Sequence, residues 1–345
     1  MRRLFLVSAT VLAASAFIAL AQQAPATGPY KVVKTSKVGG DGGSDYVYAD
    51  VAGRRLYIPR SGPSARITVF NLDTLEPAGE VAKANARGVA VDPKTNHGFA
   101  SSKPVVMFDT KTLATIKTIE VQGNPDGIMF DPFNQRVWVF SHSAPNATVI
   151  DTKDGSVVGT MDLGGAPEQA VTDEKGHIWV DLEDKDSIAA VDATTMKVTA
   201  RYDLGGKGGG PGGLGLDAKN HILFATCHTP ATMVILNADT GKIITALPIG
   251  VGTDGGGFNP NTMEAFSSNG DGTLSVIKEN SPTDFVVEQN VSTMARARTM
   301  TVDMKTNRVL LISAEYTVPP PPPPGGRAGR GQMIPDTFTI LAVGK

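Results

Sequence analysis

The sequence repeats one short motif seven times, and six of the seven copies carry a charged residue at the same position. Each copy runs from a polar or glycine residue through a short strand-like stretch to a closing Asp or Asn, as in RGVAVD (87–92). Carboxylates and guanidinium groups gathered at one place can bind a small polar molecule, an ion or a protein loop, and they shift one another's pKa values. The residues five positions before the seven closing residues are Asp45, Arg87, Asp126, Glu168, Gly212, Asp254 and Arg298.

A second set of candidate ligand-binding side chains lies eleven positions after the closing residue of a copy. Its members are Lys103, His142, Asp184 and His228. The two histidines come from the third and fifth copies, which are not adjacent, and no local spacing of the His-Glu-x-x-His kind accompanies them. We therefore treat both sets as candidate ligand-binding residues, and we assign no catalytic residue, no metal ligand and no cofactor.

The elements that must position these residues are short strands. The closing residues are 42, 39, 42, 44, 42 and 44 positions apart, and each copy contains alternating runs such as QRVWVFS (135–141) and ATVIDTKDG (147–155). Period-two alternation separated by Gly, Asp and Asn predicts strands and turns. Four short strands in roughly 42 residues form one blade of a β-propeller. Seven copies predict an all-β, seven-bladed propeller with four-stranded blades.

The two ends of the chain are expected to close this ring. The last copy lacks a fourth strand, while residues 30–39 form a strand-like run ahead of the first copy. Pairing of 30–39 with 337–343 would complete the seventh blade and leave no open sheet edge. Residues 30–345 then form a single domain. Equivalent residues of all copies stack in rings, so both candidate sets face the same end of the propeller axis.

The repeats resemble the YVTN-repeat, YncE-like family of exported bacterial β-propellers. The resemblance rests on VIDTKDGSVVGTMDLGGAPEQAVTDEKGHIWV (149–180) and ILNADTGKIITALPIGVGTDGGGFNP (235–260), which share a strand, an Asp-rich turn, a strand, a loop and an inner strand. It implies a seven-bladed propeller over residues 30–345. Some related propellers hydrolyse sugar lactones and nucleic-acid binding occurs in the group, so the resemblance does not fix one activity.

The N-terminus has the features of a Sec-type signal peptide. Arg2 and Arg3 precede an apolar or small-residue run (4–20), and Ala19 and Ala21 lie at the −3 and −1 positions of a cleavage site before Gln22. We expect a signal peptide over 1–21, a short linker over 22–29, and a periplasmic or secreted product. After cleavage no stretch is apolar enough to span a membrane, and we expect a monomer.

Composition narrows the possible functions. The 345 residues contain 32 Lys+Arg and 34 Asp+Glu, for a net charge of −2, and loss of the two arginines with the signal peptide would give −4. Because phosphate-backbone binding needs a cationic surface, nucleic acid is an unlikely partner. The single cysteine, Cys227, excludes an intrachain disulfide and the Cys-x-x-Cys-His motif of covalent haem.

Three functions remain open from the sequence. The first is a non-catalytic exported propeller that binds a small polar ligand or a protein partner at the axial face. The second is a lactonase-like hydrolase that uses the axial carboxylates, and the weakest is nucleic-acid binding. The alternative without a binding function is a solvated channel mouth, in which the Arg and Asp side chains only neutralise each other. We expect Arg87 and Arg298 to keep the neighbouring acids ionised.

Two segments depart from the repeat. Residues 318–335 form a Pro/Gly/Arg-rich insertion between two strands of the last copy, with six prolines (319–324) followed by GGRAGRGQ (325–332). The prolines favour a polyproline II segment. The insertion is either a solvated surface segment or an arm that docks a partner or covers the site. The glycine-rich run 205–213 predicts a flexible connection between copies four and five.

Overall fold

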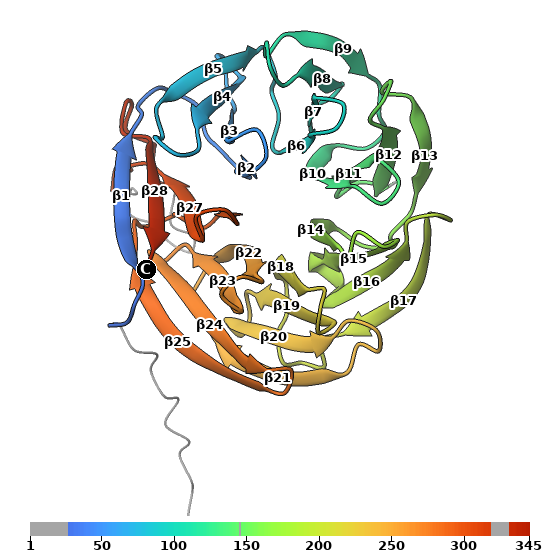
Figure 1. Ribbon diagram of the computed structural model, residues 1–345, viewed down its shortest axis with the longest axis vertical. Coiled ribbons are helices and arrows are strands. Elements are labelled where there is room, and N and C mark those ends of the chain that lie inside the picture. The colour runs from blue at the N-terminus through green and yellow to red at the C-terminus, as the bar shows by residue number, and fades with distance from the viewer. Residues whose placement is uncertain (1–26, 145, 319–330) are drawn as a thin grey trace, which may run out of the picture.

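The chain forms a ring of seven antiparallel sheets. The computed structural model describes residues 27–144, 146–318 and 331–345, and in this part of the chain each sheet has four strands (Figure 1). The predicted all-β, seven-bladed propeller is therefore confirmed. The predicted signal peptide and residues 319–330 of the insertion lie outside the described residues. Within those residues, no helix is long and apolar enough to cross a membrane.

Each of the first four blades follows the chain from the axis outward. Blade one contains β2 (Tyr48–Asp50), β3 (Arg55–Arg60), β4 (Arg66–Asn71) and β5 (Pro77–Ala82). Blade two contains β6 (Val89–Asp92), β7 (His97–Ala100), β8 (Val105–Asp109) and β9 (Thr115–Ile119). Blade three contains β10 (Pro125–Asp131), β11 (Arg136–Ser141), β12 (Ala147–Asp151) and β13 (Val157–Met161). Blade four contains β14 (Pro167–Thr172), β15 (His177–Leu182), the short 3-10 helix η1 (Glu183–Lys185), β16 (Ser187–Asp192) and β17 (Lys197–Asp203).

The last three blades complete the ring. Blade five contains β18 (Pro211–Asp217), β19 (Ile222–Cys227), β20 (Thr232–Asn237) and β21 (Ile243–Pro248). Blade six contains β22 (Thr253–Asn259), β23 (Glu264–Asn269), β24 (Thr273–Ser281) and β25 (Asp284–Ser292). Blade seven contains β26 (Met300–Asp303), β27 (Arg308–Ser313), β28 (Thr339–Gly344) and, from the other end of the chain, β1 (Lys31–Lys37).

The ring closes where the two ends of the chain meet. Strand β1 pairs antiparallel with β28, from Lys31 opposite Gly344 to Lys37 opposite Thr339 (Figure 1). Most side chains of β1 are exposed, so its contribution is mainly the backbone hydrogen bonds that cover the edge of β28. The closure predicted from the incomplete last copy is thus present in the structure.

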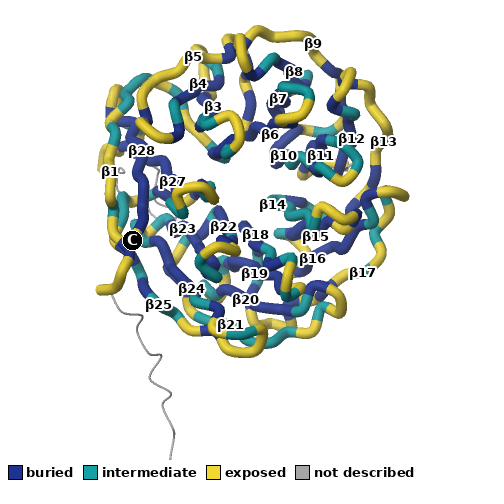
Figure 2. Tube along the Cα trace, in the orientation of Figure 1, coloured by how far each residue is buried: buried dark blue, intermediate teal, exposed yellow. Residues whose placement is uncertain are grey.

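The hydrophobic core lies between neighbouring blades. Figure 2 shows buried middle strands, whereas the outermost strands β5, β9, β13 and β17 are largely exposed. The buried Trp138 of blade three packs in one cluster with Ile178 and Val180 of blade four. Trp179 is buried between blades four and five and donates from Nε1 to the Ala238 carbonyl at 2.9 Å. Both tryptophans therefore hold neighbouring blades together.

The Asp that closes the repeated motif is a structural residue. Asp92 accepts the backbone N–H of Lys94 at 2.9 Å, which fixes the turn between the first and second strands. Its other carboxylate oxygen accepts the hydroxyl of Thr152, in the next blade, at 2.7 Å. Asp303 similarly receives two bonds of 2.8 Å from Arg54 across the seam between blades seven and one. In these copies the closing Asp therefore both fixes a turn and links its blade to the next.

One of these links joins two buried acids. Glu279 of blade six is buried near Asp217 of blade five and accepts a hydrogen bond from Asn220 Nδ2 at 2.8 Å. Burial, reinforced by the charge of Asp217, raises the pKa of Glu279 to about 7 from the ordinary value of 4.5. The folded protein thus holds a proton here that the unfolded chain releases, so stability is fully present below pH 4.5 and falls as the pH rises to about 7.

We expect Glu279→Gln to stabilise the protein at pH 8 by roughly 2–3 kcal/mol, because the neutral amide removes the cost of ionising this group. The gain should shrink toward pH 5, where wild-type Glu279 keeps its proton. Urea unfolding of both proteins at pH 5 and pH 8 measures the difference. A variant that is less stable than wild type at pH 8 would show that the carboxylate is needed in its charged form.

Candidate functional site

The charged positions of the repeat converge on a cavity of about 190 Å³ on the axis, called here the mouth cavity. Its lining residues come from the first, second, third, fourth, sixth and seventh repeats: Asp45, Arg87, Asn124, Asp126, His142, Glu168, Asp254 and Arg298. All six charged residues of the first predicted set line this cavity, together with His142 of the second set. Asn124 was not predicted.

The inner strands place these side chains. Asp126, Glu168 and Asp254 lie near the starts of β10, β14 and β22, and Arg87 and Arg298 lie two residues before β6 and β26. Every inner strand begins at the same end of the propeller, so these residues surround one opening. The loop after β11 lies at that end too, which brings His142 into the cavity.

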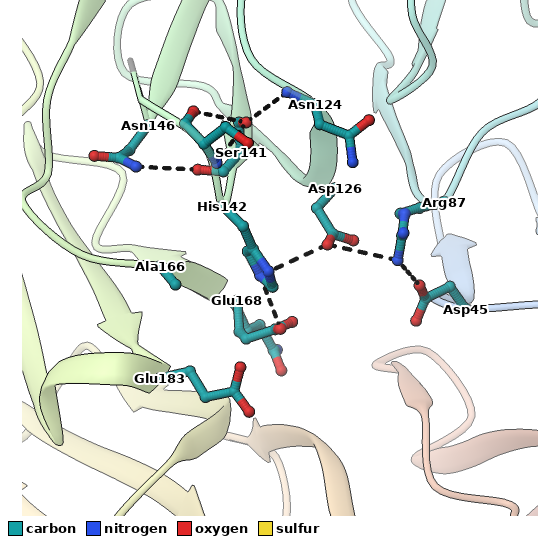
Figure 3. Close-up of polar contacts among 12 residues, drawn as sticks. Asp45, Arg87, Asn124, Asp126, Ser141, His142, Asn146, Ala166, Glu168 and Glu183 are labelled. Carbon is teal, nitrogen blue, oxygen red and sulfur yellow. Dashed lines mark hydrogen bonds and ion pairs between the residues drawn. The ribbon is translucent and has the colours of Figure 1, made fainter.

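One half of the cavity contains a continuous chain of ionic contacts (Figure 3). The Arg87 guanidinium lies 3.0 Å from Asp45 and 3.6 Å from Asp126. His142 Nε2 lies 3.6 Å from Asp126 and 2.9 Å from Glu168 Oε1. The chain therefore runs from blade one to blade four. On the far side, Arg298 Nε lies 3.0 Å from Asp254 as a separate pair.

Tyr46 extends this chain across the axis and was missed by the sequence reasoning. Its hydroxyl donates to Glu168 Oε2 at 2.7 Å, from blade one to blade four. Gly127 lets the backbones of β10 and β14 approach beside this contact: a Cβ on it would lie 2.4 Å from the Glu168 carbonyl oxygen. The sequence held a signal for Tyr46. In four copies the residue that follows the first predicted position is glycine (Gly88, Gly127, Gly213 and Gly255), whereas Tyr46 and Gln169 have large side chains at the same place.

The arginines compensate only partly for burial of the acids, and for Asp254 this corrects our expectation that they keep the neighbouring acids ionised. Burial, opposed by Arg87 and reinforced by Glu168, raises the pKa of Asp126 to about 6. Burial likewise raises the pKa of Asp254 to about 7 despite Arg298, and it raises the pKa of Asp45. Near neutral pH Asp254 therefore keeps its proton in part, whereas Asp126 is largely ionised.

His142 and Glu168 form the charged pair at the centre of the site. The hydrogen bond to Glu168 raises the pKa of His142 to about 9, although burial opposes the shift. Burial also acts against ionisation of Glu168, but hydrogen bonds from His142 and Tyr46 hold its pKa below the ordinary value. At neutral pH this pair is an imidazolium and a carboxylate.

Charge in the mouth cavity is sorted by depth. The carboxylate side chains of Asp126, Glu168 and Asp254 are 8%, 18% and 19% exposed, and those of Arg87 and Arg298 are each 49% exposed. The acids thus lie at the bottom and the guanidinium groups at the rim. A molecule entering from solvent meets positive charge first and negative charge last.

Two further hollows adjoin the mouth cavity. Below it, the central channel encloses about 660 Å³ and is lined mainly by apolar residues of the inner strands, and it shares Glu168 and Asp254 with the mouth cavity. Beside it, a polar hollow of about 460 Å³, called here the side hollow, lies between blades one and two. The side hollow shares Asp45, Arg87 and Asn124 with the mouth cavity.

The remaining residues of the second predicted set lie outside the mouth cavity. Lys103 lines the side hollow and donates to the Gly123 carbonyl at 2.5 Å. Asp184 lies in η1, where it accepts the Ala166 N–H at 2.6 Å and pairs with Lys185 at 2.7 Å. His228 lies against Gly212, the ring position that has no side chain. These residues occupy the same position of the repeat, but they lie in different surroundings.

The inner strands of blades five and six pack closely against each other. A Cβ on Gly213 of β18 would lie 2.3 Å from the backbone nitrogen of Gly256 in β22, so the two inner strands touch backbone to backbone. Gln169 of β14 joins them, since its Nε2 donates to the Leu214 and Gly256 carbonyls at 3.1 and 2.9 Å. Residues 211–213 of the glycine-rich run thus belong to a packed strand, which corrects the prediction of a flexible connection throughout 205–213.

Three side chains of the mouth cavity could hold a metal ion. Asp126, His142 and Glu168 each offer a donor atom, and the three donors lie within 4.8 Å of one another. The sequence did not reveal this group, because its members are 16 and 26 residues apart and carry no local ligand motif.

Comparison with solved structures identifies the fold class, a seven-bladed β-propeller. The structure of U3-55K superposes with a TM-score of 0.71 at 8% identity and covers 91% of this chain and 99% of its own. The WD40 repeats of RRP9 superpose with a TM-score of 0.67 at 9% identity and cover 93% and 99%. These identities show the fold alone. No protein-family model and no curated protein matches the sequence.

Proposed function

We propose that the protein is an exported, non-catalytic β-propeller that binds a small polar molecule in the mouth cavity. The observation that carries the proposal is the sorting of charge by depth, with acids buried and guanidinium groups at the rim. A small molecule with a positive centre at one end and an anionic group at the other would pair with both layers. Such a ligand would enter with its positive centre leading.

The side hollow supports a ligand larger than the mouth cavity alone would hold. Ligand cavities typically enclose about 300–1,000 Å³, and the mouth cavity alone is smaller than that range. Arg87 lines both spaces, and Lys103 adds a second cation in the side hollow. The anionic end of the ligand would therefore extend toward Arg87 and Lys103.

The lactonase-like alternative would have to use the axial carboxylates themselves. Among the described residues that line the mouth cavity, none is a Ser, Thr, Cys or Lys that could act as a nucleophile beside His142. The second candidate occupant is a loop of a protein partner. It is supported by the WD40-repeat neighbours, a class in which propellers commonly serve as interaction scaffolds.

A thermal-shift panel tests the class of ligand. The probes are an α-amino acid, glycine betaine, a simple amine, a dicarboxylate and a single-stranded oligonucleotide. We expect the two zwitterions to raise the melting temperature most, because ligand binding stabilises the folded state by mass action. A response to the oligonucleotide alone would contradict the proposal and favour nucleic-acid binding.

Export and membership of the YVTN-repeat, YncE-like group form the second part of the proposal. They are supported by the signal-peptide features of residues 1–21 and by the repeat pattern. Mass spectrometry of protein recovered outside the cytoplasm tests export. A mature N-terminus at Gln22 is expected, and intact Met1 in that material would contradict cleavage.

A further inference from the structure

We propose that Asp126, His142 and Glu168 bind a divalent transition-metal ion of the zinc type at the bottom of the mouth cavity. The inference rests on the proposed function in one respect: it takes the mouth cavity to be a binding site. It goes beyond that function by naming the cation and the side chains that hold it.

The spacing of the three donors suits such an ion. Donors bound tetrahedrally at about 2.0–2.2 Å from zinc lie about 3.3–3.6 Å apart. His142 Nε2 lies 2.9 Å from Glu168 and 3.6 Å from Asp126, so these two separations already bracket the required value. The third separation is no more than 4.8 Å. Small side-chain rotations would complete the triangle.

Asp126 is the second observation that points to a cation. Its side chain is 8% exposed and is aimed into the mouth cavity (Figure 3). It lies 3.6 Å from both Arg87 and His142, which is beyond ordinary hydrogen-bond distance. Among the described residues, Asp126 is held by these two ion pairs and by no hydrogen bond, and a metal ion would satisfy this buried carboxylate more directly.

The charge count matches a divalent ion. Asp126 and Glu168 supply two negative charges, and His142 supplies a neutral nitrogen once the metal replaces its proton. Arg87 is already paired with Asp45 at 3.0 Å. The histidine nitrogen favours zinc-like ions over calcium, which takes six to eight oxygen ligands.

The surroundings hold the ligands in place and leave a coordination position open. The Tyr46 hydroxyl donates to the second oxygen of Glu168 at 2.7 Å, an outer contact of the kind that orients metal ligands. With three protein ligands, a fourth position faces the mouth cavity. A water molecule would complete the coordination.

Titration of the full chain with Zn²⁺ by calorimetry, after removal of metal with a chelator, tests the inference. We expect one site, with affinity lowered about 100-fold or more in His142→Ala and in Asp126→Asn. Tyr46→Phe should lower it about tenfold, in line with other outer contacts. Circular dichroism melting shows that each variant is folded, and the near-isosteric Asp126→Asn serves if His142→Ala does not fold.

His228→Ala is the matched control, because His228 has the same repeat offset as His142 but lies outside the mouth cavity. Its affinity for Zn²⁺ should equal that of wild type. The absorption spectrum of bound Co²⁺ should show the intense bands of four-coordinate geometry in wild type and lose them in His142→Ala. Equal Zn²⁺ affinity in wild type and His142→Ala, or equal loss in His228→Ala, would overturn the assignment.

The two proposals can fail separately. If a zwitterion stabilises the chelator-treated protein and Zn²⁺ does not bind at these residues, the proposed function holds and the metal site is wrong. If Zn²⁺ binds as described and no zwitterion binds with or without it, the metal site holds and the proposed class of ligand is wrong.

Discussion

Removal of the first 40 residues should lower the free energy of unfolding by at least about 4 kcal/mol relative to a chain that begins at Gln22. The deletion removes β1, so the backbone groups of β28 along the seam lose their partners. It also removes Tyr30, which is buried against Phe266 with ring centroids 5.7 Å apart. Loss of a large buried aromatic side chain alone costs about 3–5 kcal/mol.

Polar contacts at Tyr30 add to this effect, because they fasten both ends of the chain to blade six. The Tyr30 N–H donates to Gln289 Oε1 at 3.0 Å, and its hydroxyl donates to the buried Glu264. Lys345, the last residue, pairs with the same Glu264 at 2.6 Å. Both ends of the seam therefore share one buried carboxylate.

Urea unfolding, extrapolated to water, measures the change. Tyr30→Ala in the chain that begins at Gln22 should give a smaller loss than the deletion, since it keeps β1. Equal stability of the two chains would contradict the role of β1 in closing the ring. A protein that stays soluble only when it begins at Gln22 would agree with it, because exposed strand edges promote aggregation.

Gly213→Ala should cost at least about 3 kcal/mol, at the upper end of overpacking effects. The new Cβ would lie 2.3 Å from the Gly256 nitrogen and 2.6 Å from the Gly255 carbonyl carbon, and neither backbone atom can move without disturbing β22. Because β22 also carries Asp254, the same change should weaken ligand binding in the mouth cavity.

Gly257→Ala is the matched control for this substitution. Gly257 lies in β22 as well, but a Cβ there would meet the Met300 side-chain end at 3.2 Å and Val302 at 3.4 Å. Flexible side-chain ends can move, so the expected loss is below about 1 kcal/mol. Unfolding free energies of both variants give the comparison, and equal losses would show that backbone contact between blades five and six is unimportant.

The sequence predicted the ring of blades because the signals for it are local. Period-two alternation and turn residues recur at a steady spacing, and the buried closing residues, such as Asp92, fix the turns that the spacing implies. The six charged ring residues were also predicted, since equivalent positions of a repeat must lie around one axis. Convergence of Arg87, Asp126 and Glu168 follows from repeat geometry alone.

What could not be predicted depends on how neighbouring blades meet. Tyr46 of the first copy donates to Glu168 of the fourth across the axis, and Gly127 of the third copy lets the backbone approach Glu168 there. His142 and His228 have the same offset, yet one reaches the acids and the other covers Gly212. The depth of each acid, and hence the raised pKa of Asp126, likewise arises from packing that no single repeat encodes.

The central claim is that the mouth cavity binds a small polar ligand through its sorted charges. The most direct test is isothermal titration of the most stabilising zwitterion from the panel into the Arg87→Ala/Arg298→Ala double variant. The control is the His177→Ala/His221→Ala double variant, because both histidines are exposed and lie outside the cavity. The arginine variant should bind the zwitterion at least tenfold more weakly, which corresponds to a loss of about 1.4 kcal/mol in binding free energy. Its free energy of unfolding should change by less than about 1 kcal/mol, because both arginines are half-exposed. Unchanged affinity in the arginine variant would contradict the claim and place the binding site elsewhere on the propeller.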